Sequence, residues 1–175
     1  MSQELPRSLA RIFEMSQVPE VLFSELMPAL GRFLDCDRCF LYLRNPETAV
    51  GRVEFCWVRD ATIPEIYDKE WKKESKFLAS QDPMFAAALS AKPSIFVEDI
   101  RTTSPEILNR EFEEKNFGHR ALIHAHLCQQ GQLWGVLQLC SFKNPKTWTE
   151  VDRQAIKRVV LAITPIAVGY VTSVM

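Results

Sequence analysis

The feature that most constrains the fold is a pair of apolar segments separated by Gln130 and Gly131. The segments at 120–128 and 133–142 are rich in the aliphatic and aromatic residues that favour strands. Glycine adopts a positive φ without steric cost, so Gln130-Gly131 is a candidate two-residue hairpin turn. Strands joined by so short a turn pair in antiparallel fashion. The sequence therefore predicts an antiparallel sheet.

Helical patterns stand at both ends of the chain. Residues 5–13 and 19–34 place apolar side chains at intervals of three and four, as amphipathic helices do. Thr149 and Asp152 have the spacing of a capping box, which predicts a last helix running to about Thr172. Helices from both ends can pack together on one face of the sheet, which makes the expected fold class α+β.

Shorter elements are expected between these helices. The remaining strands, predicted from apolar and aromatic runs, lie at 39–43, 53–58 and 95–97. Strict alternation along the second strand would put Val53, Phe55 and Trp57 on one face. The pairs Asp82-Pro83 and Ser104-Pro105 each predict a capped short helix, the second one extending to about residue 115. Residues 60–80 are polar and charged, and we expect a long loop there.

The composition fits one folded domain. The chain has 175 residues, of which 47% are apolar and 25% charged, and this size can bury a core without a disulfide or a metal. With 21 basic and 22 acidic residues, the chain lacks the basic excess of a nucleic-acid binder. The N-terminus lacks a secretory pattern, and the apolar stretch at 159–168 is short for a bilayer. We therefore expect a cytoplasmic protein with five reduced cysteines, no membrane insertion and no nucleic-acid partner.

Four segments, in this order along the chain, carry a family resemblance. They are DRCFLY at 37–42, VEDI at 97–100, FGHRALI at 117–123 and GQLWGVL at 131–137. Together they resemble a GAF domain, closest to the phytochrome and cyanobacteriochrome type. The resemblance places a single GAF domain at 18–172, preceded by an N-terminal helix at 1–17.

This resemblance implies a six-stranded antiparallel sheet with terminal helices on one face. Short helices and loops would cover a ligand pocket on the other face. Domains of this kind bind cyclic nucleotides, tetrapyrroles, haem or other small molecules, and many dimerise through the terminal helices. Bilin-carrying relatives attach the pigment to a cysteine just before the strand that begins here near Arg120. This sequence has no cysteine between Asp99 and Leu127, so a covalent bilin is not expected, whereas a noncovalent tetrapyrrole remains open.

All three histidines, His119, His124 and His126, lie within eight residues. His124, His126 and Cys128 alternate along one predicted strand and should share a face. Imidazole and thiolate can ligate a metal or haem, and imidazole can also line a ligand pocket. Packing inside the core is the third interpretation, and the sequence does not decide among the three.

The hairpin register extends this expectation to the partner strand. If the two-residue turn is followed by regular pairing, His126 faces Gly135 and His124 faces Leu137. Cys140 then falls on the opposite face, where it cannot easily complete a site with Cys128.

Four further residues complete the candidate ligand-binding set. Asp99 at a strand end can accept hydrogen bonds, and Arg120 can hold an anionic group. Phe117 and Trp57 offer aromatic surface, although packing of these rings with Phe85 would instead fill the pocket. No catalytic or metal-binding residue is assigned, because no Walker A, GxSxG or HExxH motif is present.

We therefore expect a non-enzymatic sensory or regulatory GAF domain that binds a small molecule and signals through a protein partner. A homodimer formed by the terminal helices is also expected. The alternatives are an interaction or assembly module with a self-filled pocket, and a metal-dependent redox protein built on His124, His126 and Cys128.

Overall fold

Six antiparallel strands form one open sheet in the order β3-β2-β1-β6-β5-β4, which confirms the predicted fold class. The computed structural model describes residues 4–175, so the first three residues of the predicted N-terminal helix lie outside the described part. The strands are β1 (Arg38–Asn45), β2 (Val50–Val58), β3 (Lys72–Lys73), β4 (Ile95–Val97), β5 (Ala121–Gln129) and β6 (Gln132–Ser141).

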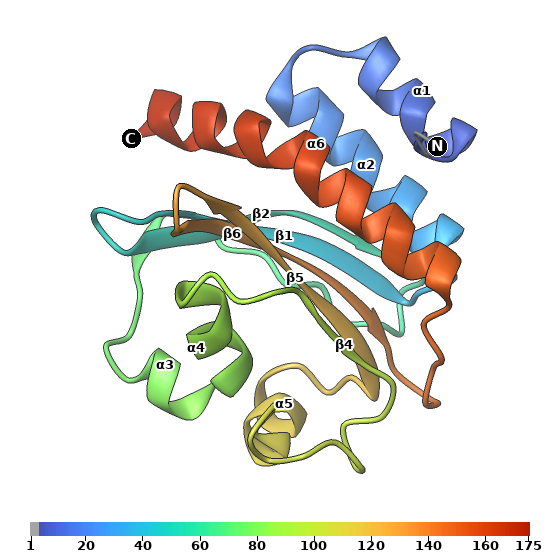
Figure 1. Ribbon diagram of the computed structural model, residues 1–175, viewed down its shortest axis with the longest axis vertical. Helices are drawn as coiled ribbons and strands as arrows, with labels where there is room; N and C mark the ends of the chain where they lie inside the picture. The colour runs from blue at the N-terminus through green and yellow to red at the C-terminus, as the bar shows by residue number, and fades with distance from the viewer. Residues whose placement is uncertain (1–3) are drawn as a thin grey trace.

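Helices cover both faces of this sheet. Figure 1 shows α2 and α6 lying across one face with α1 beside α2, while α3, α4 and α5 lie below the other face. The first group is α1 (Arg7–Met15), α2 (Pro19–Phe33) and α6 (Glu150–Val174); the second is α3 (Leu78–Gln81), α4 (Pro83–Leu89) and α5 (Arg110–Asn116). We call the two sides the helix face and the cavity face of the sheet.

Local side-chain caps explain where the helices begin. Thr149 and Asp152 form the predicted capping box at the start of α6, with reciprocal bonds of 3.2 and 2.9 Å. Asp82 Oδ1 accepts from the first backbone amides of α4, as its Asp-Pro signal predicted. The expected helix from Ser104 is wrong, because that segment forms only a turn and α5 begins after Asn109, whose Oδ1 caps it. Asparagine bonds readily to nearby backbone and so favours a cap over a helix interior.

The main core lies between the sheet and the pair α2 and α6. Leu26 and Leu30 of α2 and Val159 and Ile163 of α6 are completely buried there. Of the described helices, α6 is the one whose length and apolar composition would also suffice to cross a bilayer. Its sheet-facing row of apolar residues is instead buried in this core, as expected for a terminal core helix.

The β5–β6 hairpin has the predicted turn. Gln130 and Gly131 both have positive φ, at 52° and 73°, as a two-residue hairpin of this twist requires. Pairing is regular at Cys128–Leu133, but Leu127 then pairs with Gly135, so Trp134 is an inserted residue in β6. Such a bulge shifts all later pairs by one residue.

The bulge makes the predicted register wrong beyond the turn. His126 pairs with Val136 and His124 with Gln138. Cys140, expected on the opposite face from the histidines, pairs with Leu122 and lies on the cavity face with them. One inserted residue is enough to move a side chain from one face of a sheet to the other.

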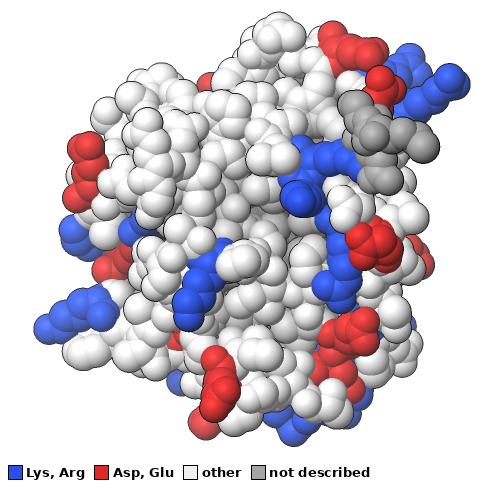
Figure 2. Space-filling view, viewed as in Figure 1, with Lys and Arg blue, Asp and Glu red and all other residues white. Residues whose placement is uncertain are grey.

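The charged residues do not gather into a single field on the face shown in Figure 2. Lysine and arginine side chains lie towards the middle of this view and at its edge, and aspartate and glutamate side chains lie mainly around the edge.

Candidate functional site

A cavity of about 300 Å³ lies on the cavity face of the sheet. Side chains from β1, β2, β5 and β6 form its floor, and residues of α3, α4 and the α5 region form its walls. The segment 66–74 lines the remaining side, and we call this segment the lid. Its lining comprises Phe40, Tyr42, Gly51, Val53, Ile66, Asp68, Lys72, Lys73, Glu74, Leu78, Asp82, Phe85, Phe112, Phe117, His124, Val136 and Gln138.

An ion pair fastens the lid to the sheet. Arg44 of β1 binds both carboxylate oxygens of Glu74, with Nε and Nη2 at 2.6 and 2.9 Å from them. Tyr42 donates its hydroxyl hydrogen to the same carboxylate at 2.6 Å, and burial raises the pKa of this phenol. Both Arg44 and Glu74 are nearly enclosed, so this bidentate contact is strong and geometrically specific.

Three polar side chains face the interior of the cavity. His124 on β5 lies directly opposite Gln138 on β6, and Asp82 stands above them at the start of α4. All three are less than a tenth exposed. Burial raises the pKa of Asp82 to about 6.

His126 supports His124 from behind the cavity wall. Its Nε2 lies 2.9 Å from His124 Nδ1, and its own Nδ1 lies 2.7 Å from the carbonyl oxygen of Lys92. Burial lowers the pKa of both imidazoles, and that of His124 falls well below its usual value. Both rings are therefore neutral at neutral pH.

His119 belongs to a separate enclosed pair. Its Nε2 lies 2.6 Å from Glu113 Oε2, and both side chains are shielded from solvent. Burial raises the pKa of Glu113 to about 8, so this carboxyl is largely protonated at neutral pH. The His119 ring stacks on Phe117 with a centroid distance of 5.3 Å, and Phe117 in turn lines the cavity. His119 thus positions a wall residue and does not itself line the cavity.

The other predicted ligand-binding residues lie away from the cavity. Asp99 and Arg120 form a two-bond ion pair at 2.7 and 2.9 Å, and this pairing lowers the pKa of Asp99 to about 2. Cys128 directs its thiol towards the Ala88 carbonyl. Trp57 packs against α2 on the helix face. Of the eight predicted residues, the structure brings only His124 and Phe117 into the lining.

The structure also bears on the two alternatives to an open ligand pocket. Phe85 and Phe117 line the cavity without filling it, and Trp57 is too remote to do so. Within residues 4–175, no group of three or more His, Cys, Asp or Glu side chains is arranged to hold a metal ion. The lining of the cavity, as described, contains no cysteine.

Sequence reasoning missed Asp82 as a lining residue of this site and Arg38 as an enclosed residue next to its Phe40. Asp82 was recognised only as a helix cap, although the same spacing also buries its carboxylate. Arg38 was not singled out, yet its guanidinium is enclosed, donates to the Pro64 carbonyl at 2.8 Å and lies over the ring of Phe142. Alternation with Phe40 and Tyr42 in β1 was the available signal that Arg38 points to the cavity face.

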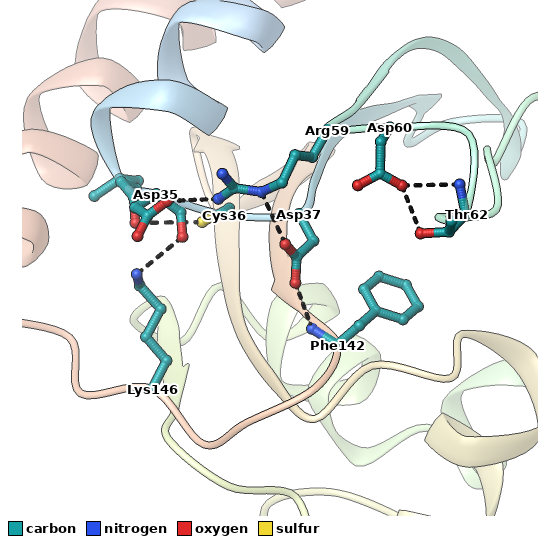
Figure 3. A network of polar contacts seen from close by, with 9 residues as sticks. Asp35, Cys36, Asp37, Arg59, Asp60, Thr62, Phe142 and Lys146 are labelled. Carbon is teal, nitrogen blue, oxygen red and sulfur yellow. Dashed lines mark hydrogen bonds and ion pairs between the residues drawn. The ribbon is translucent and has the colours of Figure 1, made fainter.

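A polar network holds together the ends of the strands beside this site (Figure 3). Asp37 accepts from Arg59 Nε at 3.0 Å and from the Phe142 backbone at 2.8 Å, and Lys146 donates to the Asp35 carbonyl at 3.0 Å. Cys36 lies within this segment, and burial raises the pKa of its thiol. Burial also raises the pKa of the Cys39 thiol, so the CxxC spacing of residues 36–39 carries two buried, protonated thiols and not a reactive pair.

Comparisons with known proteins agree with this architecture. The GAF domain profile matches residues 18–164. The phycoerythrobilin-bound GAF domain from a cyanobacterial phytochrome superposes with a TM-score of 0.71 at 17% identity, covering 96% of both chains. The cyanobacteriochrome receptor PixJ gives 0.64 at 18% identity over 85% of this chain and 94% of that one.

A GAF domain from a phosphotransferase superposes with a comparable TM-score at a lower identity. The GAF domain from an Acinetobacter phosphoenolpyruvate-protein phosphotransferase gives a TM-score of 0.70 at 10% identity, covering 96% of both chains. No curated protein matches the sequence at a significant level. Phytochrome and cyanobacteriochrome GAF domains stand among the structural neighbours, which confirms the resemblance found in the sequence. Because the GAF profile covers most of the chain, the chain belongs to the GAF domain family.

Proposed function

We propose that this GAF domain is a non-enzymatic sensory or regulatory module that binds a small molecule in the cavity and signals to a protein partner. The observation that carries the proposal is the cavity itself, whose walls are mainly apolar and aromatic with a few inward polar groups. This combination is typical of small-ligand sites. GAF domains are generally sensory modules, which supports the non-catalytic assignment.

The volume of the cavity bears on the ligand class. About 300 Å³ is at the lower end of the range of roughly 300–1,000 Å³ for pockets that hold drug-sized molecules. A tetrapyrrole needs more room than a cavity of this volume offers. The fit therefore favours a compact ligand, of one or two fused rings, over a noncovalent tetrapyrrole.

The arrangement of the sheet offers a route from the cavity to a partner. Strands β1, β5 and β6 contribute to the floor of the cavity, and their opposite face packs against α6. Ligand binding can bias the packing of the terminal helices in the sense of a population shift. Met15, Val21 and Leu161 on these helices are exposed apolar residues, at 72%, 48% and 69%, and suit a homodimer or a protein partner.

The test is ligand detection coupled to blockage of the cavity. Native mass spectrometry of the freshly purified protein and thermal-shift screening of compact heteroaromatic molecules should reveal binding. A ligand at one hundred times its dissociation constant stabilises the fold by about 2.7 kcal/mol.

Val136→Trp is designed to fill the cavity, because Val136 lies in its lining. It should abolish the thermal shift, whereas the control Val174→Trp on the exposed end of α6 should retain it. An undiminished shift in a folded Val136→Trp protein would place the ligand elsewhere and contradict the proposal.

A further inference from the structure

The hydrogen-bond chain behind the cavity determines which nitrogen of His124 carries the proton. The Lys92 carbonyl oxygen can only accept, so His126 Nδ1 at 2.7 Å must carry hydrogen. Because the His126 ring is buried and neutral, its Nε2 is then a bare acceptor. His124 Nδ1, 2.9 Å from that nitrogen, must therefore be the donor. The neutral His124 ring is left with a lone pair on Nε2.

That lone pair is available to a ligand. The only enclosed, unpartnered side-chain nitrogen or oxygen atoms among the described residues are Arg38 Nε and His119 Nδ1. His124 Nε2 also lacks a partner in this part of the chain, but it is not enclosed, and the ring lines the cavity. The histidine chain thus turns a hydrogen-bond acceptor towards the empty space.

Two more acceptors stand in the same cavity. Gln138 is the cross-strand neighbour of His124, and its amide nitrogen is directed to the Cys140 sulfur at 3.8 Å, which leaves Oε1 without a described partner. Asp82 uses Oδ1 for both backbone amides of α4, and its Oδ2 is not used in the described hydrogen bonds. All three side chains line the cavity.

The Tyr42 donor of the lining is engaged by the protein, and the two lysines of the lining are exposed at its rim. The Tyr42 hydroxyl donates to Glu74, as described above. Lys72 pairs with Asp68, and Lys73 donates to the Thr48 carbonyl at the exposed rim. The interior therefore offers acceptors to a ligand and would leave an anionic group uncompensated.

We propose that the cavity selects compact heteroaromatic ligands that present N–H donors to His124 Nε2, with His126 and the Lys92 carbonyl as the positioning groups. This inference rests on the proposed small-ligand function and deepens it by assigning the polarity of the ligand. A site built around an acceptor rejects an isostere that lacks the donor, because the buried acceptor is then left without a partner. Carboxylates and phosphates are excluded from the interior because they bring acceptors and negative charge, which the acceptors of the cavity cannot compensate.

The first test examines the protein without any ligand. Nitrogen-15 NMR of protein labelled in histidine distinguishes a protonated ring nitrogen from a bare one. We expect His124 and His126 both to be protonated at Nδ1 only, with a hydrogen-bond coupling from His124 Nδ1 to His126 Nε2. A proton on His124 Nε2 would overturn the proposal, and this result does not depend on whether a ligand binds.

The second test compares isosteric probes. Indole and benzofuran have the same shape, but indole donates an N–H where benzofuran has an oxygen acceptor. Pyrrole and furan form a smaller pair of the same kind. Calorimetry or ligand-observed NMR should show the N–H member binding about tenfold more tightly in each pair. Equal or reversed affinities would overturn the assignment of His124 Nε2 as the acceptor for a ligand N–H. Absence of binding by all four compounds would contradict the proposed function and the ligand class together, while the tautomers would still be decided by the first test.

The third test separates positioning from packing. His126→Phe removes the acceptor that fixes His124 and should bring the affinity ratio within each pair close to one. Cys128→Ala, two residues further along the same strand and outside the lining, should keep the tenfold ratio. A His126→Phe protein that binds the probes with the original ratio would show that the histidine chain does not set the selectivity.

Discussion

Replacing Glu113 by glutamine should remove a pH dependence from the stability of the fold. Burial raises the pKa of this carboxyl from 4.5 to about 8. Between these values the folded protein keeps a proton that the unfolded chain releases, so the free energy of unfolding falls as the pH rises. The linkage relation gives a loss of about 2.5 kcal/mol between about pH 5 and pH 7 from this one group. Glutamine is neutral at both pH values, has nearly the shape of glutamate and keeps an N–H donor for His119.

Urea unfolding of the wild type and of Glu113→Gln, at both pH values, measures this effect. The difference between the two proteins is the useful quantity, because other groups titrate in both. His124 and His126 have lowered pKa values, so their contribution changes in the opposite sense and is lost as the pH falls through about 6.5. The wild type should lose about 2.5 kcal/mol relative to the variant on going from pH 5 to pH 7.

Glu114→Gln supplies the matched control. Glu114 is half exposed and pairs with Arg110 on the surface of α5. Its replacement should change the pH dependence by less than about 0.5 kcal/mol, as is usual for a surface site. Parallel curves for the wild type and Glu113→Gln would refute the inference that Glu113 is held in its neutral form.

Three further substitutions test the strands and helices that support the site. Gly135→Ala would put a methyl group 2.5 Å from the backbone oxygen of Tyr42, so urea unfolding should show a loss of about 1–3 kcal/mol. Gly169→Ala, with nothing within 4 Å, should instead gain up to about 1 kcal/mol from helix propensity, and a similar loss in both would contradict the steric argument. Thr149→Ala removes the bond to the Asp152 amide in the capping box and should cost about 1 kcal/mol, which thermal unfolding followed by circular dichroism can measure. An unchanged melting temperature for Thr149→Ala would show that this cap contributes little.

The elements that the sequence predicts correctly are those whose signals lie within a few neighbouring residues. The turn at Gln130-Gly131 needs two positive φ values, and the cap at Thr149 needs an oxygen and an amide within one helical turn. The strand faces depend on more distant pairing. Val53 was expected beside Phe55 and Trp57, yet the register shifts between Leu41 and Tyr42, and Val53 packs on the cavity face. A pattern of period two cannot reveal an inserted residue.

The candidate site was predictable in the same limited sense. Alternation correctly placed His124 and His126 on one face, but it could not separate the ring that lines the cavity from the ring that supports it. That distinction depends on Lys92, which lies more than thirty residues away in the chain. Asp82 and Glu74 reach the cavity through loops whose course no local propensity determines. The sequence therefore indicates which strand carries the polar groups, and the tertiary contacts decide their roles.

The bulge at Trp134 follows from the apolar pattern of β6 and not from the turn. With regular pairing, Leu137 and Leu139 would leave the core beneath α6, and Gln138 would enter it. Removing each leucine from an apolar core costs about 1.5–3 kcal/mol, and an unpaired buried amide adds about 1–3 kcal/mol. These losses amount to several kcal/mol, and insertion of one residue avoids them all. The same insertion places Gln138 opposite His124. The bulge that keeps Leu137 and Leu139 in the core therefore also brings together the two acceptor side chains of the cavity.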